Sequence, residues 1–111
     1  MLNVFIVDDA LVIRKNLIRF FTSLGHTIVG EAQNGNEALE KCENIENIDL
    51  ITMDITMPGM DSIETTKLMK EIKPDTTIMM VTSHGQEEYV AQALSAGARS
   101  FLLKPITEDK L

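Results

Sequence analysis

Short runs of apolar and β-branched residues alternate along this sequence with longer segments in which apolar residues recur at helical spacing. We expect strands at residues 2–7, 27–32, 50–53, 77–82 and 100–103, and helices at 11–24, 35–42, 61–72 and 86–96. Strands that alternate with helices predict an α/β fold built on a parallel sheet. The 111 residues suffice for one domain, which we assign to residues 1–111.

The composition of the runs predicts their places. Runs 2–7, 50–53 and 77–82 are almost continuously apolar, which is typical of central parallel strands covered on both faces. Run 27–32 contains Glu31, so we place it at an edge. The helical spacing also predicts which side chains face the core, namely Ile13, Leu17, Phe20 or Phe21, Leu24, Cys42, Val90, Ala93 and Leu94. His26 is expected at the surface.

The charge balance excludes several classes of protein. Ten basic residues against 17 acidic ones give a net charge of −7, which disfavours a broad nucleic-acid-binding face. A single cysteine, Cys42, excludes an internal disulfide. No apolar run reaches the roughly 20 residues that span a bilayer, and the first residues lack the pattern of a signal peptide. We therefore expect a cytoplasmic protein with neither a nucleic-acid nor a membrane partner.

Polar residues stand at the ends of four predicted strands: Asp8-Asp9, Asp54, Thr82-Ser83 and Lys104-Pro105. In open α/β sheets, ligands bind outside the carboxyl ends of the strands. Each of these groups alone has an ordinary explanation; Asp8-Asp9, for example, could simply cap the next helix. Their coincidence at four strand ends favours a functional site.

The chemistry of these groups indicates what such a site could do. Clustered carboxylates repel one another unless a cation binds or their pKa values shift, and an all-oxygen site suits Mg²⁺. Lys104 offers a positive charge to an anion, and Thr82 and Ser83 offer hydroxyl and N–H donors to its remaining oxygens. Together they describe a phosphoryl-transfer site with an aspartate as the nucleophile.

At this point the sequence resembles a known family, the receiver domains of two-component response regulators, and especially their CheY-like chemotaxis type. The resemblance covers essentially the whole chain and is carried by Val7-Asp8-Asp9, Met53-Asp54-Ile55-Thr56-Met57-Pro58-Gly59-Met60-Asp61, Val81-Thr82-Ser83 and Phe101-Leu102-Leu103-Lys104-Pro105. It implies a flavodoxin-like, doubly wound five-stranded parallel sheet in the strand order 2-1-3-4-5. That order would bring Asp9 next to Asp54.

The resemblance also implies roles for the site residues. Asp54 would accept a phosphoryl group from a phosphohistidine of a sensor histidine kinase. Asp9, Asp54 and the backbone carbonyl of Thr56 would ligate Mg²⁺ directly, and Asp8 would act through water. Lys104 and Thr82 would hold phosphoryl oxygens.

Two further residues and one peptide bond follow from the same resemblance. On phosphorylation Thr82 would shift toward the site, and Phe101 would turn inward into the vacated space. Many receivers carry tyrosine at the position of Phe101. The Lys104-Pro105 peptide bond is predicted to be cis, because only proline makes that form inexpensive. His84 is interpreted as an exposed loop residue, with control of water access to the site as the alternative.

Receivers normally end with a fifth helix, and residues 107–111 resemble only its cap and first turn. We therefore expect the fifth helix to be truncated or missing. Apolar side chains of the first and third strands, together with the helix around Ile13 and Leu17, would then meet water. A dimer or an exchange of segments between two copies would hide them.

The main functional prediction is a phosphorylation-controlled binding module whose own catalysis is limited to phosphoryl uptake and hydrolysis. Its output would be chemotaxis, through a flagellar motor switch protein, or else a fused effector domain in a longer regulator. An aspartyl-phosphate phosphatase is the enzymatic alternative, disfavoured because Thr56 stands where those enzymes carry a second aspartate. A dinucleotide-binding fragment is disfavoured because no glycine-rich loop follows the first strand.

Overall fold

The five predicted strands form one parallel sheet. The computed structural model of the chain describes residues 1–55, 61–83 and 85–111. The strands are β1 (Asn3–Val7), β2 (Thr27–Ala32), β3 (Leu50–Asp54), β4 (Thr77–Thr82) and β5 (Ser100–Leu103). They pair in the order β2-β1-β3-β4-β5, with every neighbouring pair parallel. This confirms the predicted strand order, and it places Glu31 on an edge strand as expected.

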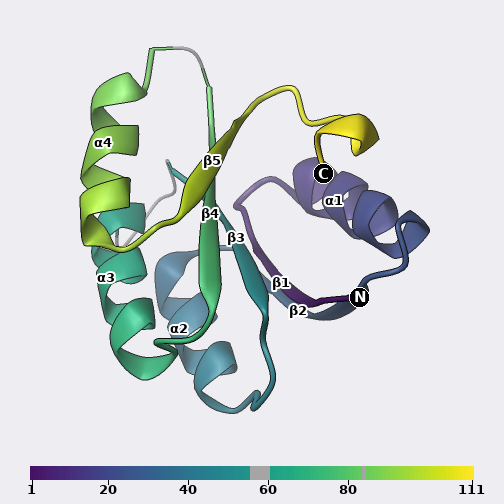
Figure 1. The fold of residues 1–111 in the computed structure, drawn as a ribbon, viewed down its shortest axis with the longest axis horizontal. Helices are drawn as coiled ribbons and strands as arrows, with labels where there is room; N and C mark the ends of the chain where they lie inside the picture. The colour runs from purple at the N-terminus through teal and green to yellow at the C-terminus, as the bar shows by residue number, and fades with distance from the viewer. Residues whose placement is uncertain (56–60, 84) are drawn as a thin grey trace.

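Helices cover both faces of the sheet unequally. Among the described residues the α-helices are α1 (Leu11–Ser23), α2 (Gly35–Glu43), α3 (Ser62–Ile72) and α4 (Glu87–Ala96). Figure 1 shows α2, α3 and α4 on one side of the sheet and α1 alone on the other. Helices α2 and α3 begin with side-chain caps, because Asn34 accepts from the N–H of Glu37 and Asp61 from that of Glu64.

The larger core lies between the sheet and α2–α4. It includes Phe5 and Val7 of β1, Ile51 and Met53 of β3, and Cys42, which is fully buried as predicted. Val4 and Ile6, which alternate along β1 with Phe5 and Val7, point to the other face instead. This alternation is the normal consequence of the two-residue period of a strand.

The second core is smaller and is covered by α1 and by the segment after β5. Val4, Ile6, Leu17 and Phe21 are buried there, and Ile106 and Leu111 pack against them. A single 3₁₀ turn, η1 (Glu108–Lys110), precedes Leu111. The expectation that side chains of the first strand and of the helix around Leu17 meet water is therefore wrong: Val4 and Ile6 are 0% exposed and Leu17 is 1% exposed. Helix α1 lies directly on the strands, and the last residues fold back beside it, while Leu50 of β3 stays partly exposed.

Three other side chains depart from the predicted burial. Leu94 is 41% exposed, because the stripe of α4 that contacts the sheet passes through Val90 and Ala93 and leaves Leu94 at its margin. Leu24 is 44% exposed, because α1 ends one residue before it. His26 is half-buried rather than superficial, since its Nδ1 accepts from the N–H of Leu2.

No helix in the described ranges combines the length and the apolar character needed to cross a bilayer.

Candidate functional site

The carboxyl ends of the strands bring the predicted site residues to one rim of the sheet. Strand β1 ends at Val7, which lies opposite Met53 of β3, so the following residues Asp8 and Asp54 occupy adjacent positions. Asp54 in turn lies opposite Val81 of β4. Parallel pairing therefore places both carboxylates at the carboxyl ends of neighbouring strands, as the strand-end pattern predicted.

The three aspartates of the rim form one acidic cluster. Asp8, Asp9 and Asp54 each offer a carboxylate oxygen, and these oxygens lie within 4.8 Å of one another. Asp8 and Asp54 are buried, with exposed fractions of 1% and 3%, whereas Asp9 is exposed. The strand order thus does bring Asp9 close to Asp54.

Lys104 faces the two buried carboxylates of this cluster. Its Nζ lies 3.6 Å from Oδ1 of Asp54 and 3.7 Å from Oδ2 of Asp8. The lysine follows β5 directly, and the peptide bond between Lys104 and Pro105 is cis. Its side chain is only 25% exposed, so one ammonium group lies beside both carboxylates at the margin of the rim.

Asp8 is held in place without forming a helix cap. Its Oδ1 accepts from the N–H of Ala10, at 2.9 Å, and α1 begins after Ala10 with no side-chain cap. Its carbonyl accepts from Nη1 of Arg14, at 2.7 Å. Burial raises the pKa of Asp8, an effect that the Ala10 hydrogen bond and the charge of Lys104 oppose only in part. The simple capping explanation of Asp8-Asp9 therefore does not account for this carboxylate.

The cluster fits a bound divalent cation. Oδ2 of Asp8 is buried and has no hydrogen-bond partner among the described residues, which is costly for a carboxylate oxygen. Two buried carboxylates and an exposed third within one small space are the hard oxygen ligands that Mg²⁺ prefers. The predicted fourth contributor, the carbonyl of Thr56, lies outside the described residues.

Asp54 is anchored through its backbone. The hydroxyl of Ser62, the first residue of α3, donates to the carbonyl of Asp54. The next N–H, of Ile55, continues the pairing by donating to the carbonyl of Val81 at 2.9 Å. These bonds connect Asp54 to both β4 and α3, so its carboxylate is presented from a rigid support.

Thr82 ends β4 on the far side of Asp54 and Ser83 follows it. Both contact a residue that the sequence predicted as the start of a helix but not as part of the site. The Oγ1 of Thr82 donates to Oε1 of Gln86 at 2.9 Å, and the N–H of Ser83 donates to the same oxygen at 2.7 Å. Gln86 precedes α4 directly, and a glutamine at a helix start carries no distinctive sequence signal. Its part in the site emerges only from this geometry.

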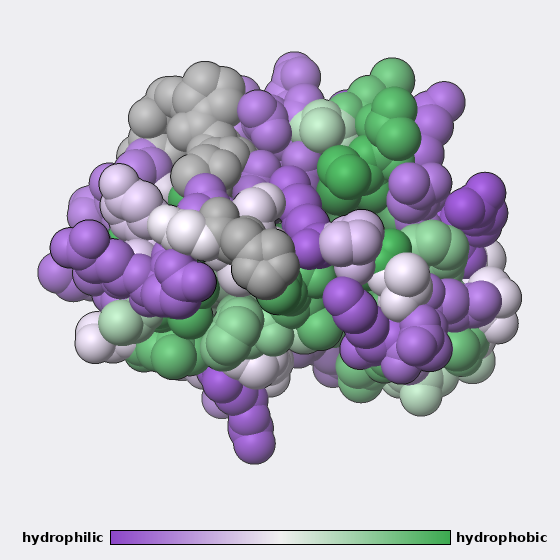
Figure 2. Space-filling model, turned by 90° about the horizontal axis from the view of Figure 1, so that it is seen from above, coloured by the Kyte–Doolittle hydropathy of each residue, from purple (hydrophilic) through white to green (hydrophobic). Residues whose placement is uncertain are grey.

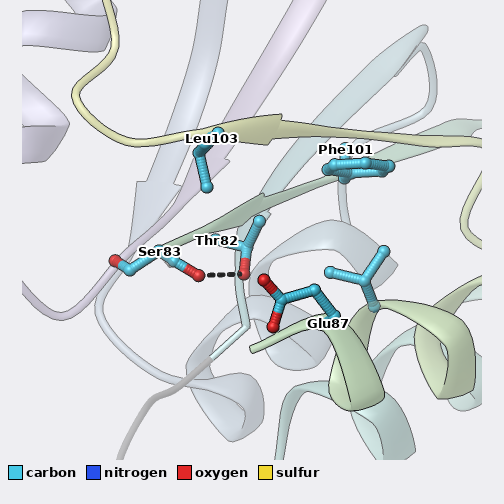
Figure 3. A pocket seen from close by; sticks show the side chains of 6 residues that line it. Thr82, Ser83, Glu87, Phe101 and Leu103 are labelled. Carbon is cyan, nitrogen blue, oxygen red and sulfur yellow. Dashed lines mark hydrogen bonds between the residues drawn. The ribbon is translucent and has the colours of Figure 1, made fainter. Parts of the chain in front are cut away.

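A pocket of about 330 Å³ opens behind Thr82, between β4, β5 and α4. In Figure 3, Thr82 and Glu87 point toward each other while Phe101 lies on the opposite wall. The ring of Phe101 is 49% exposed, so it does not fill the pocket. His84, the predicted loop residue, lies outside the described residues.

Comparisons with known proteins agree with this geometry. The family model of the response regulator receiver domain matches residues 4–111. The chain belongs to the response regulator receiver family. It is 40% identical over 108 residues to the chemotaxis protein CheY of Thermotoga maritima, and these residues make up 97% of this chain and 89% of that protein.

Two further similarities show how widely this receiver's relatives vary. A solved CheX–CheY–BeF₃–Mg²⁺ complex from Borrelia burgdorferi superposes with a TM-score of 0.91 at 39% identity, over 98% of this receiver and 82% of that chain. The transcriptional regulatory protein YhcZ of Bacillus subtilis is 40% identical over 111 residues, which make up 99% of this receiver but only 51% of that protein. Receivers of this kind are signalling modules of two-component systems.

Proposed function

We propose that this receiver accepts a phosphoryl group on Asp54 from a phosphohistidine of a sensor histidine kinase and changes its partner binding in response. The observation that carries the proposal is the position of Asp54: its carboxylate is buried among two other aspartates, and its Oδ1 lies 3.6 Å from Nζ of Lys104. Such a grouping supports nucleophilic attack by a carboxylate on a bound anion.

In the proposed reaction a carboxylate oxygen of Asp54 forms a bond to phosphorus as the phosphorus–nitrogen bond of the donor breaks. The imidazole of the donor leaves, and Lys104 remains beside a phosphoryl oxygen, where its charge offsets the negative charge of the transferred group. Mg²⁺, when held by Asp9, Asp54 and the carbonyl of Thr56 with Asp8 acting through water, would neutralise further charge. Thr82 and Ser83 would donate to the remaining oxygens.

Phosphorylation of Asp54 can be tested directly. Incubation with acetyl phosphate and Mg²⁺ should add the mass of one phosphoryl group to the intact protein. Asp54→Asn should abolish the addition. Asp75→Asn is the matched control and should label like the parent. Asp75 is an exposed aspartate just before β4, at the opposite end of the strand from the site. Labelling of Asp54→Asn at the parent level would refute the proposal.

Asp9 and Asp8 are expected to contribute differently to Mg²⁺ affinity. Asp9 is exposed and open to a cation, whereas Asp8 is already engaged by the N–H of Ala10 and lies near Lys104. Calorimetric titration should therefore show Asp9→Ala weakening Mg²⁺ binding more than Asp8→Ala does. Equal affinities of the parent and Asp9→Ala would remove Asp9 from the ligand set.

Thr82 and Phe101 are proposed to couple the site to the surface of α4 and β5. The pocket between them gives Phe101 space to turn inward once Thr82 moves toward the phosphoryl group. Thr82→Ala should still bind beryllofluoride, a phosphoryl mimic, yet its NMR shifts in α4 and β5 should respond less than those of the parent. Identical responses would contradict the coupling.

For the output we propose chemotaxis, with a flagellar motor switch protein as the partner, because CheY proteins are similar over nearly their full length. The similarity to YhcZ keeps a fused effector domain as the second candidate. Beryllofluoride-dependent binding of a motor switch peptide, followed by fluorescence anisotropy, separates the two.

We place the protein in the cytoplasm, where the single free thiol, Cys42, would stay reduced.

We also propose that a polypeptide of residues 1–111 pairs with a second copy, or exchanges segments with it, through the α1 face. The start of α1 leaves Leu11 53% and Val12 68% exposed, and Figure 2 shows hydrophobic surface on the side of α1. Analytical ultracentrifugation should detect a dimer at micromolar concentrations, and Leu11→Ser with Val12→Ser should dissociate it. Tyr89→Ser, on exposed α4, is the control. A compact parent monomer would refute the pairing.

A further inference from the structure

The two donors assigned to the phosphoryl group are already occupied within the protein. Oε1 of Gln86 accepts from the hydroxyl of Thr82 at 2.9 Å and from the N–H of Ser83 at 2.7 Å. Both distances are those of well-formed hydrogen bonds. One side-chain oxygen therefore stands in for an anion oxygen at the same pair of donors.

We propose that Gln86 is a positioning residue that competes with the phosphoryl group for Thr82 and Ser83. The inference rests on the proposed function, since it presupposes that these donors serve Asp54. A hydroxyl carries a single hydrogen and so donates fully to one acceptor at a time. Thr82 can turn its hydroxyl toward Asp54 only by releasing Gln86, and the phosphorylated and unphosphorylated forms differ in which acceptor it serves.

The burial of Thr82 strengthens the competition. Thr82 is 3% exposed, so water is not a ready substitute partner for its hydroxyl. Among the described residues, the other acceptor for the hydroxyl is the carbonyl of Ser83, at a long distance of 3.4 Å. The hydrogen bond to Gln86 thus satisfies a buried donor in the absence of a phosphoryl group, and it raises the cost of turning that donor toward one.

The position of Gln86 connects this competition to α4. Gln86 is the N-cap residue of α4, and its carbonyl accepts from the N–H of Val90 at 3.1 Å, while its side chain makes no capping bond. The next residue, Glu87, lines the pocket together with Thr82 and Phe101. Release of the Gln86 side chain would therefore remove two hydrogen bonds that join the start of α4 to the end of β4, and the start of α4 adjoins the pocket into which Phe101 would move.

Binding of beryllofluoride in the presence of Mg²⁺, measured by calorimetry, tests the inference. Gln86→Ala should bind beryllofluoride about 3- to 30-fold more tightly than the parent, because two intramolecular hydrogen bonds no longer oppose binding. Gln86→Asn, whose shorter side chain cannot span both donors, should behave like Gln86→Ala. Gln92→Ala makes the same chemical change at an exposed position of α4 and should match the parent.

The gain should depend on the hydroxyl that Gln86 holds. Thr82→Val removes the hydroxyl with little change of shape, so Gln86→Ala should gain clearly less in a Thr82→Val background than in the parent. A general loosening of α4 would give the same gain in both. NMR adds a second readout: the Ser83 amide should exchange faster in unliganded Gln86→Ala than in the parent, and the two proteins should converge when beryllofluoride binds.

The outcomes separate this inference from the function on which it rests. If the parent fails to bind beryllofluoride, or if Asp54→Asn binds it equally well, the proposed function is wrong and the competition falls with it. If the parent binds it at Asp54 but Gln86→Ala binds no more tightly, the competition is refuted while the proposed function stands. Weaker binding by Gln86→Ala would reverse the assignment and make Gln86 a direct support of the ligand.

Discussion

The two faces of the sheet carry hydrophobic cores of different size. Fifteen buried apolar residues among those described form the core between the sheet and α2–α4, whereas four form the core beneath α1. On β1 the two sides are nevertheless equally inaccessible, since the neighbours Phe5 and Ile6 are both 0% exposed. At β4 the faces diverge, because Met80 is fully buried on the α2–α4 face whereas its neighbour Met79 is only partly buried on the α1 face. The thinner cover of the α1 face therefore buries β1 fully but β4 only in part.

This difference separates two contributions to stability. On the α2–α4 face, each strand residue is covered by helices that also contact one another, so a lost side chain leaves a closed cavity. On the α1 face, partly exposed residues such as Ile13, Ile18 and Met79 surround the four buried ones. A lost side chain there leaves space that solvent or a shifted neighbour can fill.

The largest expected contrast is in thiol reactivity. Cys42 lies in the core of the α2–α4 face, where burial raises its pKa to about 12. At pH 8 it should react with a thiol reagent only through opening of that face. A Ser23→Cys thiol at the exposed end of α1, in a Cys42→Ala background, should react more than about a thousandfold faster, as expected for opening that costs several kcal/mol. Comparable rates would mean that the thicker cover opens readily.

The next contrast uses two methionines of β4 that point to opposite faces. Met80 is fully buried in the larger core, and Met79 lies partly buried in the smaller one. Met80→Ala should lower the free energy of unfolding by about 2–5 kcal/mol. Met79→Ala, the same change at the adjacent residue, should cost no more than about half as much. Urea denaturation measures both, and equal losses would contradict the difference between the faces.

A smaller effect is expected from overfilling the larger core at its edge. A Cβ on Gly30 of β2 would lie 2.7 Å from Cε2 of Phe5, whose ring is fully buried. Gly30→Ala should therefore cost about 1–3 kcal/mol. In a Phe5→Leu background, which removes the obstructing ring edge, the same substitution should cost less. An unchanged cost would show that the ring moves aside without difficulty.

The smallest effect is expected from the segment that closes the smaller core. Ile106 packs against the buried residues beneath α1 but is itself only partly buried. Ile106→Ala should lower the free energy of unfolding by about 1 kcal/mol, in proportion to the apolar area that it covers. Thermal denaturation at fixed protein concentration would measure this. A loss as large as that of Met80→Ala would show that Ile106 contributes as much stability as a fully buried residue of the larger core.

The elements of the fold were predictable because each carried its own local signal. Apolar runs located all five strands, and Glu31 marked an edge strand correctly. Errors arose where periodicity alone had to decide the limit of a buried stripe. Leu94 has the spacing of a core residue, but neighbouring elements determine whether a helix is covered on that flank.

The candidate site was predictable to the extent that parallel pairing brings strand ends together. Asp8, Asp54 and Lys104 meet as the strand-end pattern required. The contact of Gln86 with Thr82 and Ser83 was not predictable in the same way. It depends on side-chain conformation at a helix start, and nothing in the residue type or the spacing specifies which donor a glutamine will meet.

The register of β1 against β3 has a consequence for how such sites persist as sequences diverge. Val7 faces Met53 across the central ladder, so the backbones that carry the following aspartates leave two strands spaced about 4.8 Å apart. Backbone hydrogen bonding determines that spacing, whatever side chains fill the layers on either side. A substitution in a covering helix should therefore leave the spacing between the two aspartate-bearing backbones unchanged, even where it lowers stability.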